Sequence, residues 1–256
     1  MMSNNTYRNR RKRTITAYLI KILVILILAV MITLMICGCI YLCEHFVENN
    51  EEIYNNDKHD VETNPPVNFT PPDTNTAPEF CVVIDPGHGG SDGGAEIEGV
   101  AEKRINLSVA LKLKAFLEKN NIKVILTRSS DEFVYLSERT TIANEANADL
   151  FISLHCNSYP DDPHVTGLEC YYKHGAAEGE ALAKTVLDAA KSSNNINVRN
   201  TRAEDYYVLN HTSMPAVLVE MGFLTNAAER QKLNTDAYQQ VIAESIAKAV
   251  LKTLND

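Results

Sequence analysis

The longest uncharged stretch of the sequence constrains the fold of this chain most. Residues 22–43, ILVILILAVMITLMICGCIYLC, are 22 consecutive residues without Asp, Glu, Lys or Arg. As an α-helix rising about 1.5 Å per residue they would extend roughly 33 Å, which matches a hydrocarbon layer about 30 Å thick. We therefore predict a transmembrane helix over residues 22–43.

Charged residues on the two sides of this stretch predict its orientation. Segment 1–21 is basic, whereas the residues just after Cys43 are acidic, beginning with Glu44 and Glu48. Basic flanks stay in the cytoplasm, so we expect a single-pass protein of the cell membrane, with its N-terminus in the cytoplasm and the rest outside. One alternative is a lipoprotein attached through Cys39, and another is a cleaved secretory signal, which would give a secreted form. Such a signal normally has an apolar core of about 7 to 15 residues and an A-x-A-like site, and we find neither.

Segment 44–79 has the composition of a linker. It contains nine acidic residues, one Lys and five of the chain's nine prolines. Such a segment buries too little apolar surface to offset the entropy cost of ordering it. We interpret it as a tether with a mean reach on the order of 35 Å.

The remaining segment, 80–256, is predicted to be one folded domain. It has 177 residues, a usual size for a single domain, and a net charge of −7. This acidic balance argues against nucleic acid as a partner, because phosphate binding needs clustered Lys and Arg. Its three cysteines are Cys81, Cys156 and Cys170. Their odd number and the absence of a C-x-x-C pair do not indicate a disulfide framework.

Apolar runs of strand length alternate with helical patterns along this domain. The pattern predicts an α/β fold with a mixed, mostly parallel central sheet of about six strands flanked by helices. The expected strands are Cys81–Asp85, Lys123–Thr127, Leu150–His155, Gly167–Tyr172, Tyr207–Leu209 and Ala216–Glu220. The expected helices are Lys103–Asn120, Ser137–Ala146, Glu178–Ser193 and Asp236–Leu254.

Polar side chains follow three of the predicted strands. His88 comes just after the first strand, His155 ends the third, and Glu220 ends the last. Ligands of open α/β sheets bind beyond the carboxyl ends of the strands, so we expect these residues to share one edge of the sheet. Glu102 begins the first helix and is a fourth candidate.

Two imidazoles and a carboxylate can bind Zn²⁺ and leave a fourth position open for water. His88, Glu102 and His155 could supply this ligand set, with Glu220 as the general base. We expect Asp85 and Asn157 to fix the orientation of the histidines. Cys156 should point to the opposite face of the sheet, because strand side chains alternate, and is interpreted as a buried thiol.

Each of these residues also has a structural interpretation. A histidine at a strand end is often only hydrogen-bonded, as we expect for His164, His174 and His211. Glu102 could simply interact favourably with the helix dipole, and PGHGGSDGG could form an anion-binding nest of backbone amides. The shared placement of His88, His155 and Glu220 at strand ends favours the metal interpretation.

Five ordered segments resemble the zinc-dependent N-acetylmuramoyl-L-alanine amidases of bacterial cell-wall metabolism. They are VVIDPGHGGSDGGA (Val82–Ala95), GVAEKRINL (Gly99–Leu107), LSERTTIAN (Leu136–Asn144), LFISLHCNS (Leu150–Ser158) and YYVLNHTSMPAVLVEMGFLTN (Tyr206–Asn226). The resemblance implies zinc ligands at His88, Glu102 and His155 and a catalytic glutamate at Glu220. It also implies a mixed sheet flanked by helices, and hydrolysis of the amide that joins N-acetylmuramic acid to L-alanine of the stem peptide.

The resulting hypothesis is a membrane-anchored peptidoglycan hydrolase. One alternative is a membrane-anchored module that binds peptidoglycan without cleaving it. Another is a zinc peptidase, but the sequence contains no H-E-x-x-H. An exposed site on a tether also suggests restraint by location or by a regulatory protein partner, and no residue identifies which.

Overall fold

The computed structural model describes residues 79–193 and 195–256. The predicted basic segment 1–21, transmembrane helix 22–43 and linker 44–79 lie outside the described residues, apart from Glu79. Among the described helices, none combines the length and the apolar character needed to cross a membrane.

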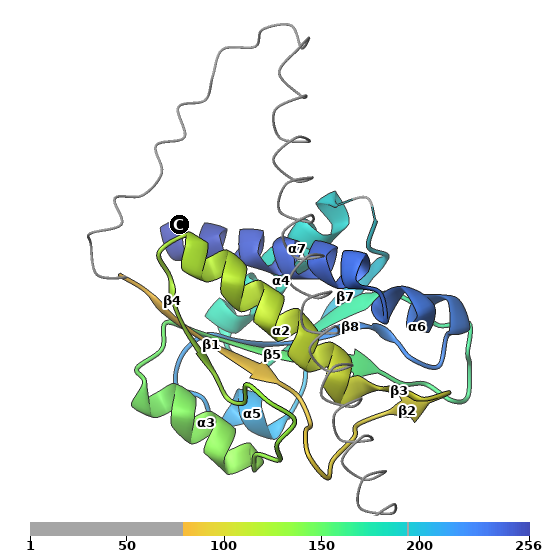
Figure 1. Ribbon diagram of the computed structural model, residues 1–256. Helices are drawn as coiled ribbons and strands as arrows, with labels where there is room; N and C mark the ends of the chain where they lie inside the picture. The colour runs from red at the N-terminus through yellow and green to blue at the C-terminus, as the bar shows by residue number, and fades with distance from the viewer. Residues whose placement is uncertain (1–78, 194) are drawn as a thin grey trace, which may run out of the picture. The chain divides into compact units, whose positions relative to one another are not determined.

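The described chain alternates strands and helices (Figure 1). The strands are β1 (Cys81–Pro86), β2 (Glu96–Ile97), β3 (Val100–Ala101), β4 (Lys123–Leu126), β5 (Leu150–Asn157), β6 (Leu168–Tyr172), β7 (Val198–Ala203) and β8 (Ala216–Phe223). The helices are α2 (Glu102–Lys119), α3 (Leu136–Glu145), α4 (Ala177–Ser192), α5 (Tyr207–Asn210), α6 (Ala227–Leu233) and α7 (Asp236–Asn255).

Six of the strands form one sheet in the order β4-β1-β5-β8-β6-β7, and β2 and β3 form a separate antiparallel pair. Strands β4, β1, β5 and β8 run parallel to one another. Strand β6 is antiparallel to β8, and β7 is parallel to β6. The prediction of a mixed, mostly parallel sheet of about six strands is confirmed.

Helices cover the two faces of this sheet unequally (Figure 1). Long helices α2, α4 and α7 lie on one face, and the shorter helices α3 and α5 lie on the other. Alternate strand residues supply the two cores, because successive side chains point to opposite faces. Val82, Ile84 and Ile152 belong to the larger core, whereas Val83 and Phe151 belong to the smaller one.

One predicted element was wrong, and the structure contains elements that were not predicted, among them β2 and β3. Tyr207–Leu209, predicted as a strand, is the single helical turn α5, in which the amide of Asn210 donates to Tyr206 O. A run of three residues cannot show whether its period is that of a helix or a strand. Strand β7 was not predicted, because few of its residues are apolar. Helix α6 is short, and it begins with an Asn226 cap that accepts from the amide of Glu229.

The topology brings four strand ends to one edge of the sheet. Because β4, β1, β5 and β8 are parallel, their carboxyl ends meet at this edge. His155 and Glu220 are register partners on the neighbouring strands β5 and β8. The fold therefore places these two predicted site residues side by side.

Candidate active site

The loop after β1 places His88 beside the end of β5. His88 has a left-handed backbone (φ 60°), which costs free energy in a residue with a Cβ. Two glycines permit close approach of the site residues. A Cβ on Gly87 would lie 2.2 Å from Cε1 of His155, and a Cβ on Gly94 would lie 2.5 Å from Oε2 of Glu102. A larger residue at either position would displace those side chains.

Two buried arginines from distant elements hold this loop in place. Arg128 donates from Nε to the carbonyl oxygen of Pro86 at 2.8 Å and from Nη2 to that of Gly87 at 2.9 Å. Arg139, on α3, donates from Nη2 to the carbonyl oxygen of His88 at 2.9 Å. These bonds satisfy carbonyl groups that the turn leaves without strand partners.

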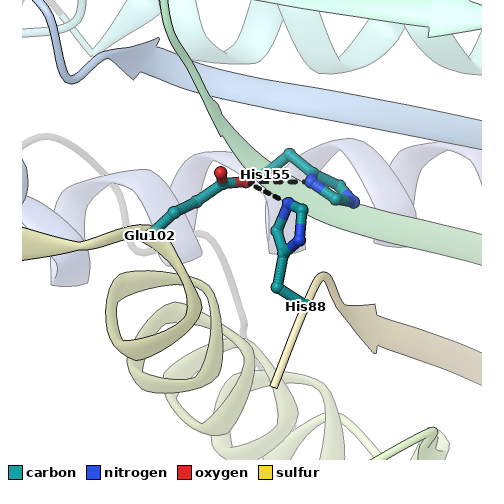
Figure 2. A group of neighbouring side chains, drawn as sticks. All are labelled: His88, Glu102 and His155. Carbon is teal, nitrogen blue, oxygen red and sulfur yellow. Dashed lines mark hydrogen bonds and ion pairs between the residues drawn. The ribbon is translucent and has the colours of Figure 1, made fainter. Parts of the chain in front are cut away.

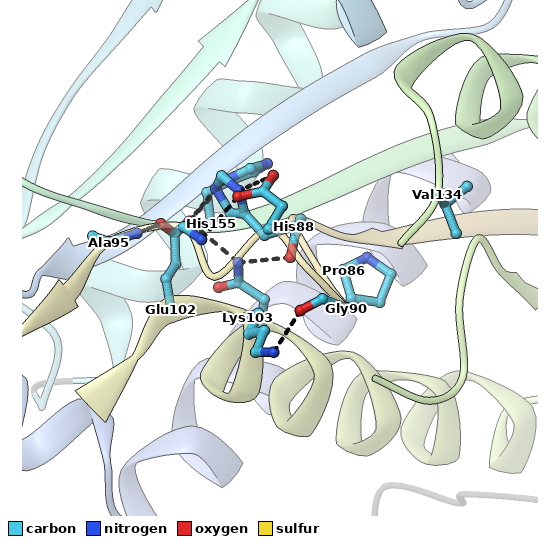
Figure 3. A network of polar contacts seen from close by, with 12 residues as sticks. Pro86, His88, Gly90, Ala95, Glu102, Lys103, Val134 and His155 are labelled. Carbon is cyan, nitrogen blue, oxygen red and sulfur yellow. Dashed lines mark hydrogen bonds and ion pairs between the residues drawn. The ribbon is translucent and has the colours of Figure 1, made fainter. Parts of the chain in front are cut away.

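The same loop is tied to the first turns of α2 (Figure 3). Lys103 Nζ donates to the carbonyl oxygen of Gly90 at 2.8 Å and pairs with Asp131 Oδ2 at 2.8 Å. Asn106 Nδ2 donates to the carbonyl oxygen of Gly87 at 3.2 Å. The loop that carries His88 and the helix that begins with Glu102 thus form one connected unit.

Glu102 lies between the two histidines (Figure 2). Its Oε1 atom is 3.1 Å from Nε2 of His88 and 2.9 Å from Nδ1 of His155. The carboxylate also accepts from the backbone amides of Ala95 at 2.9 Å and Cys156 at 3.1 Å. Its side chain is buried, so these bonds fix its position.

The three side chains form a group suited to a metal ion. One possible ligand atom from each of His88, Glu102 and His155 lies within 4.8 Å of the others, and this is the only such group among the described residues. Two imidazole nitrogens and a carboxylate oxygen are the donor set of many catalytic zinc sites. The structure therefore brings together all three ligands that the sequence predicted.

Hydrogen bonds control the charges of this group in the metal-free protein. Burial lowers the pKa of His88, but hydrogen bonds with Glu102 and Asp92 outweigh it and raise the pKa to about 9. Burial raises the pKa of Glu102, yet hydrogen bonds from His155 and His88 hold this pKa well below its usual range. A metal ion would take the place of the proton shared within the group, so metal binding should release a proton.

Glu220 lies beside this group but outside its hydrogen bonds. Its Oε2 atom is buried and has no hydrogen-bond partner. Burial raises the pKa of Glu220 to about 7; the charge of His155 opposes the rise, and the charges of Glu102 and Glu169 add to it. A carboxylate with this pKa exchanges a proton readily near neutral pH.

The expected roles of Asp85 and Asn157 in orienting the histidines were wrong. Asp85 accepts from Thr127, Arg139 and Ser153 instead. Asn157 binds the amide of Ser158 with its own Oδ1 atom. Both side chains form hydrogen bonds with groups other than the histidines. A single sequence does not reveal these partners.

Asp92 fixes His88 and was missed by the sequence analysis. Its Oδ2 atom lies 2.8 Å from Nδ1 of His88, and its Oδ1 atom accepts from the amide of Gly94 at 3.1 Å. The signal was available, because Asp92 is the acidic residue of the same glycine-rich loop. Arg139 carried no such signal, since it is 51 residues from His88.

The other histidines and Cys156 lie outside the candidate site. His164, His174 and His211 are exposed and lie outside the His88 group. Cys156 is 3% exposed and packs in the larger core, on the face opposite to His155. Burial raises the pKa of its thiol well above the usual value, so it is a poor nucleophile.

A cleft of about 560 Å³ opens beside the two histidines and Glu220. One wall contains Phe133 and Tyr135 from the loop before α3, and Tyr206 at the start of α5 also lines the cleft. His88, His155 and Glu220 therefore lie along the lining of one cleft, whereas the Glu102 side chain is buried behind them.

Comparisons with known proteins agree with this geometry. The sequence model of the family described as N-acetylmuramoyl-L-alanine amidase matches residues 82–252. The N-acetylmuramoyl-L-alanine amidase CwlM of Bacillus licheniformis is 36% identical over 177 residues, which are 68% of this chain and 68% of that protein.

Solved structures show the same fold. The N-acetylmuramoyl-L-alanine amidase AmiC2 of Nostoc punctiforme is 41% identical, with a TM-score of 0.66 over 69% of this chain and 98% of that chain. The CwlD amidase from Clostridioides difficile, solved in complex with the GerS lipoprotein, is 30% identical, with a TM-score of 0.66 over 69% of this chain and 98% of that chain.

Proposed function

This chain belongs to the N-acetylmuramoyl-L-alanine amidase family, and from that premise we propose that it is a zinc-dependent peptidoglycan hydrolase. The bond cleaved is the amide between N-acetylmuramic acid and L-alanine of the stem peptide. One observation carries the zinc dependence: the ligand atoms of His88, Glu102 and His155 converge beside a buried carboxylate, Glu220, that has an unpartnered oxygen.

His88, Glu102 and His155 would hold the metal ion. Zinc bound by such residues acts as a Lewis acid toward the scissile carbonyl and lowers the pKa of water. Asp92 fixes the His88 ring through Nδ1, which leaves Nε2 to face the ligand group. The backbone amides of Ala95 and Cys156 hold the Glu102 carboxylate. The carboxylate would therefore move little when a metal ion replaces the proton that it shares with the histidines.

Glu220 is the general base of the proposed reaction. Its pKa of about 7 allows it to accept a proton from the attacking water and then to donate that proton to the leaving amine. The unpartnered Oε2 atom is free for this exchange because it has no other hydrogen bond to break. The cleft beside Glu220 is large enough to receive part of a polymer.

We also propose that the chain is anchored in the cell membrane and bound by a regulatory protein. The apolar stretch 22–43 and the basic segment before it support an anchor with the catalytic domain outside the cell; cleavage of the N-terminal segment would give a secreted form. The CwlD amidase was solved in complex with the GerS lipoprotein, and this complex supports the proposal that a regulatory protein partner binds this chain.

Digestion of purified peptidoglycan by the full chain in mild detergent tests the proposal. We expect mass spectrometry to detect intact stem peptides with a free L-alanine amine, activity to disappear with a chelator, and zinc to restore it. Binding without released peptide would support the non-catalytic module instead. Cleavage between amino acids would support a peptidase, and undiminished activity in the zinc-free protein would contradict zinc dependence.

A further inference from the structure

A second groove adjoins the active-site cleft on the same face of the sheet. It has a volume of about 410 Å³, and its lining includes Glu169, Tyr171, Arg199, Arg202 and Phe223. The two hollows are neighbours, because Tyr171 lines the second groove, Tyr206 lines the active-site cleft, and the centroids of their rings are 5.4 Å apart.

Strand register shows how this groove relates to Glu220. Glu220 of β8 pairs with Glu169 of β6, and Tyr171 of β6 pairs with Arg202 of β7. Neighbouring strands are about 4.8 Å apart, so β7 is about 10 Å from β8. An extended peptide covers that distance with about three residues.

The second groove has an available positive charge. The Arg199 guanidinium pairs with the buried Glu169 carboxylate and lies 5.4 Å from the centroid of the Phe223 ring. Tyr171 also donates to Glu169, at 2.8 Å. Arg202 is exposed and has no ion pair or hydrogen bond with the side chain of another described residue. Two arginines against one glutamate leave this groove cationic, although segment 80–256 carries a net charge of −7.

The opposite end of the active-site cleft is aromatic. Phe133 and Tyr135 are 46% and 67% exposed, and their rings form an edge-to-face pair 4.9 Å apart. Leu136 extends this surface and is 54% exposed. Contiguous exposed apolar side chains at the edge of a cleft are typical of a binding surface, and aromatic rings suit the apolar faces of sugar rings.

From these two ends we infer the direction in which substrate binds, a proposal that rests on the proposed function. The substrate has sugar rings on one side of the scissile amide and a peptide with carboxylates on the other. The sugar side lies against Phe133 and Tyr135. The stem peptide crosses β6 toward β7, where Arg202 binds a carboxylate of its second or third residue.

The cationic end is tested with two soluble muramoyl peptides that differ only in whether the peptide carboxylates are free or amidated. We expect the full chain in detergent to prefer the free form. Arg202→Ala should lower kcat/KM for the free form by up to about 5-fold, as expected for one exposed ion pair, and much less for the amidated form. Arg202→Lys should recover part of the loss. Lys248→Ala removes an exposed charge from α7, across the sheet, and should leave the preference unchanged.

The aromatic end is tested with Tyr135→Ala on muramoyl peptides of short and long glycan. Tyr135→Ala should lower kcat/KM more for the longer glycan and keep the preference for free carboxylates. The direction is overturned if Arg202→Ala affects free and amidated substrates equally, or if Tyr135→Ala abolishes the carboxylate preference. A zinc-loaded wild-type chain that releases no peptide would overturn the proposed function as well, whereas hydrolysis without these differences would overturn the direction alone.

Discussion

Asp85 near the end of β1 and Glu220 near the end of β8 face the same cleft, two strands apart in the sheet. Asp85 is 1% exposed and accepts hydrogen bonds from Thr127, Arg139 and Ser153. Glu220 has a buried oxygen without any partner. Both carboxylate oxygens of Asp85 thus have hydrogen-bond partners, whereas one carboxylate oxygen of Glu220 has none.

This difference supports a structural role for Asp85 and agrees with the proposed chemical role of Glu220. Asp85 holds Arg139, which in turn holds the carbonyl group of His88, so its charge maintains the loop. Glu220 gains no such stabilisation, and burial raises its pKa to about 7. An unpaired buried carboxylate lowers the free energy of unfolding, and this cost is consistent with the proposed role of Glu220 as general base.

Glu220→Gln should have the largest effect. Because the amide cannot accept a proton, we expect kcat on purified peptidoglycan to fall by up to about 10⁴-fold. Metal content should stay at the wild-type level, as measured by elemental analysis, since Glu220 is outside the ligand group. Retention of more than a tenth of the activity would show that Glu220 is not the base.

Asp85→Asn should affect folding and not the chemical step directly. Removal of one partner leaves the buried Arg139 charge uncompensated, so we expect the free energy of unfolding to fall by about 3 to 5 kcal/mol. Denaturant unfolding of the 80–256 fragment measures this. Asp188→Asn makes the same change at an exposed site on α4 and serves as the control. Equal stability of the two variants would refute the structural role of Asp85.

Glu220→Gln should also stabilise the metal-free fragment at high pH. The folded-state pKa of Glu220, about 7, lies above the usual value of 4.5, so the ionised group favours the unfolded state once the pH exceeds 4.5. This cost reaches its full size above pH 7 and is on the order of 3 kcal/mol.

Unfolding measurements at several pH values would check the sign of this effect. The variant should exceed the wild type in unfolding free energy at pH 8, and the difference should shrink toward zero near pH 4.5. An increase in the free energy of unfolding that does not depend on pH would indicate a packing effect instead.

Asp92 is a third carboxylate to compare with Asp85 and Glu220. It is exposed, and it contacts the predicted metal ligand His88. Asp92→Asn should weaken zinc binding about 10- to 100-fold, since the charge that orients His88 is lost. Competition with a chromogenic chelator measures the affinity. Glu96→Gln, an exposed change of the same charge nearby, should bind zinc like the wild type, and matching affinities for both variants would count against this role of Asp92.

Regular elements of the domain could be predicted from periodicity, with informative exceptions. Five of the predicted strands and all four predicted helices correspond to elements of the structure. Strand β7, with the sequence VRNTRA, was missed because it pairs only with β6 at the sheet edge and buries little apolar surface. Its pairing with β6, and not its own residues, makes it a strand.

The sequence by itself indicated that His88 follows a strand and that His155 and Glu220 lie near the carboxyl ends of two others, and parallel strands bring such residues to one edge. Only the tertiary structure decided that the Asp85 carboxylate has hydrogen-bond partners and that one oxygen of Glu220 has none. It also decided that Asp92 contacts His88. These outcomes depend on side chains such as Arg139, which lies 54 residues from Asp85 in sequence. Periodicity reports whether a residue faces the core, but it carries no information about which distant side chain will meet it there.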